Sequence, residues 1–202
     1  MTTTPKHARG AGLLAAVIAA ATLSGCVGGP APAGPSDTPP PAPGTASATP
    51  TDSVAQESAK KAGIDLTELG DPIGSATIPA QGTDSAEDTL TVTLHQLKRV
   101  GPSVLGVYSF EVESSSTDAQ TLRAYLGGLP WRPYLIDQVN LTKHAVLEGG
   151  TASARTDSDS VRFAPGQTHY AYAYFAGPPA DVTAMDAIIT EGAPPVTQVK
   201  LS

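Results

Sequence analysis

The sequence has a single cysteine, Cys26, among its 202 residues. An intramolecular disulfide is therefore excluded, although small exported domains often depend on such bonds. Any folded part of this chain must be stable through the packing of its side chains alone.

Basic residues are also scarce. Lys and Arg number 12 against 19 Asp and Glu, which leaves a net charge of −7 with neutral histidines. Proteins that bind nucleic acid need a basic face to meet the phosphates. We therefore expect no nucleic-acid partner, and we attribute the acidity to a solvated surface.

No apolar stretch has the length of a membrane-spanning helix. Such a helix needs roughly 20 apolar residues to cross a hydrocarbon core about 30 Å thick. The run from Ala11 to Leu23 is shorter than this, and it follows the basic residues Lys6 and Arg9. This arrangement is typical of a cleavable export signal, which we assign to residues 1–25.

The residues at the end of this run resemble the lipobox of bacterial lipoproteins. Leu23, Ser24 and Gly25 precede Cys26, and the resemblance implies cleavage between Gly25 and Cys26 and a diacylglyceryl thioether on the Cys26 thiol. Because one acyl chain binds a bilayer marginally and two or three bind it stably, we expect a lipid anchor on the extracytoplasmic face of the cell membrane. The alternatives are a chance cysteine after an ordinary signal peptide and a buried thiol.

A segment rich in Pro, Ala, Ser and Thr follows the lipobox, and we assign residues 26–52 to the lipidated N-terminus and a disordered linker. The segment has too little apolar surface to offset the entropy of ordering it. Its prolines favour an extended chain, as in a tether. Its Ser and Thr residues are candidates for O-glycosylation.

Residues 53–70 are expected to hold a short helix and a connector. Ser53 and Gln56 have the spacing of a capping box, and Gly63 stands where a helix would end. A helix of this length is marginal alone, so it is either a frayed end of the linker or is docked on the domain. In the docked case, the apolar residues that face the domain are Ile64, Leu66 and Leu69.

From about Pro72 onward, apolar residues recur at every second position, as in strands. A hairpin is predicted around Gly101 and Pro102, with the inward residues Leu90, Val92, Leu94, Tyr108, Phe110 and Val112. Further strands are predicted at 120–126, 134–141, 161–163, 168–175, 183–190 and 196–201. Short strands at this spacing favour an all-β fold, a single antiparallel β-sandwich over residues 71–202.

The second half of the chain also carries a family resemblance. The residues that carry it are Leu135, Asp137, Ala164, Pro165, Gly166, Gln167, Tyr172, Phe175, Pro178, Pro179, Ala180, Asp181 and Val182. They resemble a group of uncharacterised actinobacterial envelope lipoproteins whose domains are similar to the immunoglobulin-like β-sandwich of secreted mycobacterial antigens. The resemblance implies an immunoglobulin-like fold and supplies no catalytic residue.

Residues with the chemistry for catalysis or metal binding are few and scattered. His95, His144 and His169 lack metal-ligand spacing, and the chain lacks a G-x-S-x-G serine. Asp157 and Asp159 are too few for a calcium shell. We therefore predict no catalytic residue, metal or cofactor. The glycosylation sequon at Asn140 is interpreted as accidental.

The aromatic residues offer the one candidate binding surface. Alternation places Tyr170, Tyr172 and Tyr174 on one face of a strand, where they would stack on sugars or anchor an interface if exposed. We favour burial in the core or a partly covered edge. Trp131 lies in a loop and either extends an exposed patch or plugs the end of the sandwich, the alternative we favour.

These observations predict a non-enzymatic binding or scaffold module. It would be presented on a lipid-anchored tether to an envelope polymer or an envelope protein. The alternative is a cell-wall-acting enzyme or its accessory subunit, with His144 or His169 near a carboxylate.

Overall fold

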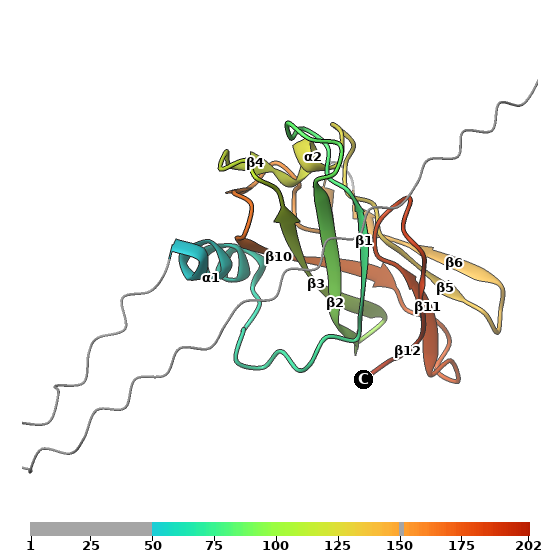
Figure 1. Cartoon of the computed structure of the whole chain (residues 1–202). Coiled ribbons are helices and arrows are strands. Elements are labelled where there is room, and N and C mark those ends of the chain that lie inside the picture. The colour runs from blue at the N-terminus through green and yellow to red at the C-terminus, as the bar shows by residue number, and fades with distance from the viewer. Residues whose placement is uncertain (1–49, 150–151) are drawn as a thin grey trace, which may run out of the picture. The chain divides into compact units, whose positions relative to one another are not determined.

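A computed structural model describes residues 50–149 and 152–202, which Figure 1 shows as a ribbon. The chain divides into two units, Met1–Gly44 and Thr45–Ser202, and the described residues belong to the second. The predicted export signal, Cys26 and nearly all of the predicted linker lie outside the described residues.

The first sheet has four antiparallel strands in the order β1-β2-β3-β10. They span Gly74–Pro79, Thr89–Val100, Ser103–Glu113 and Thr168–Ala176. β2 and β3 form the predicted hairpin, and all six of its predicted inward residues are buried. Gly101 in its turn has a φ of 57°, which suits a residue without a Cβ.

A β-bulge interrupts the regular alternation of β2. The register with β3 shifts between Leu94 and Gln96, so that Leu97 returns to the core and is 1% exposed. Without the extra residue, Leu97 would point to the opposite face.

The second sheet has the order β12-β11-β5-β6, again antiparallel. Its strands span Val196–Lys200, Ala184–Ile188, Tyr134–Asp137 and Thr142–Ala145. The strand predicted at 134–141 ends early because the Asp137 carboxylate accepts the backbone N–H groups of Val139 and Asn140, at 2.8 and 3.0 Å. These bonds form a turn, and the chain reverses into β6.

The strand predicted at 120–126 is wrong beyond its first two residues. β4 covers Gln120–Thr121 and pairs with β9, Arg162–Phe163, while Leu122–Tyr125 form the short helix α2. The Thr121 hydroxyl accepts the N–H of Ala124 at 3.3 Å, and Leu122 and Tyr125 are both fully buried. Two inward residues three positions apart match a helix and not a strand.

A further two-stranded sheet pairs β7, Glu148–Gly149, with β8, Ala152–Ser153.

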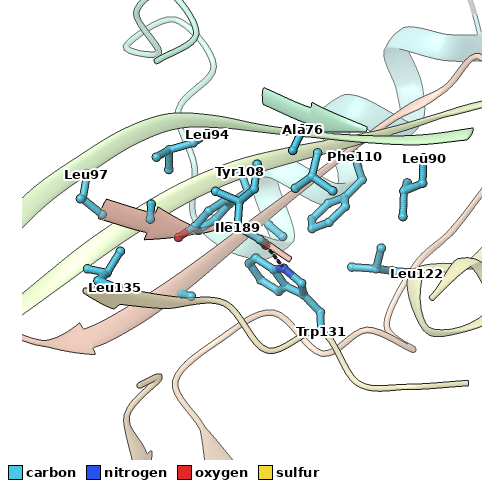
Figure 2. Packing of buried hydrophobic residues seen from close by; sticks show 14 of the residues in the cluster. Ala76, Leu90, Leu94, Leu97, Tyr108, Phe110, Leu122, Trp131, Leu135 and Ile189 are labelled. Atoms are coloured by element: carbon cyan, nitrogen blue, oxygen red, sulfur yellow. Dashed lines mark hydrogen bonds between the residues drawn. The ribbon is translucent and has the colours of Figure 1, made fainter. Parts of the chain in front are cut away.

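Both four-stranded sheets contribute side chains to one hydrophobic core. In Figure 2, Leu94, Tyr108 and Phe110 of the first sheet lie across from Leu135 of the second sheet and from Trp131. The described chain is mostly strand with antiparallel sheets, so the all-β prediction is confirmed.

The helix α1, Pro50–Ala62, is docked on the domain. Ser58 and Ala59 are buried, and the Ser58 hydroxyl accepts the backbone N–H of Tyr170 in β10 at 3.0 Å. The helix begins before Ser53, so the predicted start was placed too late. Its end at Gly63, which has a φ of 69°, is confirmed. The N–H groups of Gly63 and Ile64 donate to the carbonyl oxygens of Lys60 and Ala59, and these are the two hydrogen bonds of a Schellman motif.

The close approach of Gly106 to Tyr108 generates a stability prediction. A Cβ at Gly106 would lie 2.6 Å from the Tyr108 hydroxyl oxygen, and the Tyr108 ring is fully buried. We expect Gly106→Ala to lower the free energy of unfolding by about 1–3 kcal/mol through overpacking, measured by urea denaturation. Gly70→Ala is the control, because no atom lies within 4 Å of that added Cβ. Equal stability of the two variants would contradict the prediction.

Candidate functional site

An apolar pocket of about 230 Å³ lies beside α2, at the end of the domain where Figure 1 places α2 and β4. It is formed by the end of β1, by α2 and the loop after it, and by the loop after β11. The apolar side chains of its wall are Ile78, Pro79, Tyr125, Leu126, Leu129 and Trp131, and polar groups come from Gln81, Arg132, Thr190 and Glu191.

Trp131 forms the fixed part of this wall. Its side chain is 1% exposed, and its Nε1 donates a hydrogen bond to the carbonyl oxygen of Ile189 at 2.8 Å. Its ring meets those of Tyr108 and Phe110 edge to face, at centroid distances of 4.9 and 5.2 Å (Figure 2). Trp131 therefore does not extend an exposed patch, and its burial agrees with the favoured prediction that it plugs the end of the sandwich.

The loop before Trp131 is turned by two glycines. Gly127 and Gly128 have φ angles of 70° and 82°, a region that other residues rarely adopt. Arg123 holds this loop, because its guanidinium donates to the Gly128 carbonyl at 3.1 Å and pairs with Asp159 at 2.7 Å. Leu129 is thereby placed on the pocket with 59% of its surface exposed.

The tyrosine face lies on the first sheet, on the side away from the core. Ala171, Ala173 and Phe175 are fully buried, whereas Tyr170, Tyr172 and Tyr174 between them are half-buried. The alternation is as predicted, and the tyrosines do not form half of the core. The connector after α1 partly covers Tyr172 and Tyr174 and leaves a groove of about 230 Å³.

The three histidines lie apart from the pocket over Trp131. His95 shares a hydrogen bond of 2.8 Å with the Ser109 hydroxyl, and Nδ1 of His144 is 2.9 Å from the carbonyl oxygen of Ala176. His169 is 1% exposed and stacks on Phe163 at a centroid distance of 5.1 Å. Within residues 50–149 and 152–202, no group of three or more His, Cys, Asp or Glu is arranged to hold a metal ion.

Burial governs the protonation of the groups in the core. It lowers the pKa of His169 to about 4, with a further contribution from the positive charge of Lys61. Burial likewise raises the pKa of the Tyr108 hydroxyl. Both side chains are therefore neutral near pH 7, as a low-dielectric interior requires.

The sequence did not predict the pocket itself. Trp131 has a signal in the sequence, whereas Ile78 and Glu191 have none, because they come from separate segments that meet only in the folded chain. The one signal in the sequence was a tryptophan in a loop among glycines and prolines.

Comparisons of the chain with known protein families, curated proteins and solved structures find no match.

The buried imidazole of His169 generates a pH prediction. Its folded-state pKa of about 4 lies below the ordinary value of 6.5, so between pH 6.5 and 4 the unfolded chain takes up a proton that the folded chain does not. The associated stability is fully present above pH 6.5 and is lost as the pH falls toward 4, amounting to about 3 kcal/mol.

We expect His169→Phe to remove this part of the pH dependence. Urea denaturation of both proteins at pH 7.5 and pH 4.5 measures it, and the wild type should lose about 2–3 kcal/mol more than the variant. A parallel loss in the two proteins would show that His169 does not titrate as described.

Proposed function

We propose that this protein is a lipoprotein, anchored by acylated Cys26 on the extracytoplasmic face of the cell membrane, that presents a binding or scaffold module to envelope components. The anchor is supported by the short apolar run that ends in Leu23, Ser24, Gly25 and Cys26. No helix among the described residues is long and apolar enough to cross a membrane.

The observation that carries the binding function is the pocket over Trp131. An apolar concavity with a few polar groups is the most common form of a ligand site. This one has a preformed wall, because hydrogen bonding and ring contacts hold Trp131 in place. Leu129 adds an exposed apolar side chain at its edge.

The size of the pocket restricts what it binds. Its volume of about 230 Å³ is below the range of roughly 300–1,000 Å³ for sites that enclose a drug-sized ligand. The pocket suits one apolar group of a larger molecule, such as part of an envelope polymer or a side chain of an envelope protein.

We further propose that the domain is an immunoglobulin-like sandwich of the envelope lipoprotein group that the sequence resembles. In that fold, strands A, B and E share one sheet and strands C, F and G the other. Assigning β2, β3 and β10 to A, B and E, and β5, β11 and β12 to C, F and G, agrees with the observed neighbours. β6 then takes the place of the added strand beside C, and Trp131 lies just before strand C.

Replacement of Cys26 tests the anchor. We expect Cys26→Ala to move the protein from the membrane fraction to the soluble fraction and to remove the mass of the acyl chains, because the thioether cannot form. Cell fractionation with mass spectrometry measures both effects. A variant that stays membrane-bound with an unchanged mass would refute the lipid anchor.

Replacement of Leu129 tests the pocket. We expect Leu129→Asp to reduce the material cross-linked to the protein in intact cells about tenfold or more, because a carboxylate would occupy an apolar contact. Val139→Asp is the matched control, since Val139 is 72% exposed on the turn between β5 and β6. Urea denaturation checks that both variants remain folded. Equal recovery from the wild type and both variants would exclude the pocket from binding.

A further inference from the structure

A second cavity adjoins the pocket over Trp131. This groove of about 200 Å³ extends from Arg132 along β5 and β6 to Arg155. Arg132 and Glu191 line both cavities, so the two cavities lie side by side. Together the two volumes fall within the usual range for a complete ligand site.

The groove gathers positive charge in an acidic protein. Arg132, Lys143 and Arg155 line it together with the carboxylates of Glu148 and Glu191. Three cations against two carboxylates give an excess of positive charge there, although the whole chain has a net charge of −7. Such a local reversal of sign concentrates anions at the groove.

The two guanidinium groups keep their hydrogen-bond donors available. In the part of the chain that the structure describes, the side chains of Arg132 and Arg155 make no hydrogen bond or ion pair. The ammonium of Lys143 lies over the Tyr134 ring, 3.8 Å from its centroid, which fixes its position beside them.

Arg155 is the residue that an anion would stabilise most. Its side chain is half-buried, and burial lowers its pKa, as does the neighbouring charge of Arg132. Glu148 and Asp157 oppose this effect from a distance. A bound anion would replace the water that the Arg155 guanidinium has lost and would offset the repulsion between Arg155 and Arg132.

We propose that the groove binds the phosphate of a phosphate monoester whose apolar substituent occupies the pocket over Trp131. Two planar guanidinium forks and an ammonium suit phosphate oxygens, and the excess of one positive charge over the two carboxylates favours an anion in the groove. This inference rests on the binding part of the proposed function and does not require the lipid anchor.

The same chemistry has two sources, a lipid headgroup of the phosphatidic acid type and a soluble organic phosphate. In both, an apolar body carries a terminal phosphate. The experiment below therefore has one arm for each source.

The first arm uses the full chain with Cys26→Ala and titrates it with phenyl phosphate, phenol and inorganic phosphate. Calorimetry gives the affinities, and fluorescence reports on the pocket because Trp131 is the only tryptophan. We expect phenyl phosphate to bind at least tenfold more tightly than phenol or inorganic phosphate, with a change in Trp131 emission.

The arginine variants locate the phosphate. We expect Arg155→Gln and Arg132→Gln each to weaken phenyl phosphate binding on the order of tenfold to a hundredfold. Arg155 does not line the pocket over Trp131, so Arg155→Gln should leave phenol binding unchanged. Arg162→Gln removes the same charge from β9, outside the groove, and should have no effect.

The second arm measures co-sedimentation of the same proteins with vesicles of phosphatidylcholine, with and without phosphatidic acid. Binding that needs phosphatidic acid and is lost in Arg155→Gln assigns the lipid source, whereas binding of phenyl phosphate alone assigns the soluble source. Equal affinity for phenol and phenyl phosphate would overturn the phosphate site and leave the pocket intact. If none of the probes binds, the phosphate site is overturned as well. The proposed function is tested separately, by the cross-linking of Leu129→Asp.

Discussion

The buried indole of Trp131 connects parts of the domain that lie far apart in the sequence. Its Nε1 bonds to the carbonyl oxygen of Ile189, 58 residues away, and its ring packs edge to face on Tyr108 and Phe110. The first contact holds the loop beside β11 in the second sheet, and the ring contacts hold it against β3 in the first. Because the same side chain forms the pocket wall, the geometry of the core and that of the candidate site are coupled.

Polar contacts of single side chains hold the segments that pass between the sheets. Arg99 donates to the carbonyl oxygens of Pro178, Pro179 and Val182 at 2.9, 2.8 and 2.6 Å, and so holds the crossover from β10 to β11. The outer edge of β10 is covered as well, since Tyr170 and Tyr172 donate their N–H groups to the hydroxyls of Ser58 and Thr156. Covering an edge in this way reduces pairing with other chains.

The candidate site combines a rigid wall with unpaired charge. The apolar pocket is built on Trp131, whose position is determined by the core, whereas Arg132 is exposed and Arg155 is half-buried, and neither has an ion pair in the described chain. A preformed apolar contact lowers the entropy lost on binding, and charged hydrogen-bond donors add specificity for the geometry of the ligand. The proposed ligand, with an apolar part and an anionic part, would make use of each.

Local patterns predicted much of the fold. The alternation in 90–94, 108–112 and 168–175 predicted the hairpin and the last strand of the first sheet, and Gly63 and Gly101 marked the end of α1 and the turn. The errors occurred where a side chain bonds to nearby backbone. Asp137 ends β5 and Thr121 begins α2 through such bonds. The periodicity of apolar residues carries no information about these bonds.

The sequence by itself determined the single cysteine, the acidic charge, the short apolar run before Cys26 and the dominance of strands, because these are properties of composition and local order. The tertiary structure alone decided that α1 is docked, that Trp131 is buried, and that the tyrosines lie outside the core. It also brought Ile78, Leu129 and Arg132 to one pocket and Arg155 to the adjoining groove. Such groupings depend on contacts between residues distant in the chain, and local patterns do not encode those contacts.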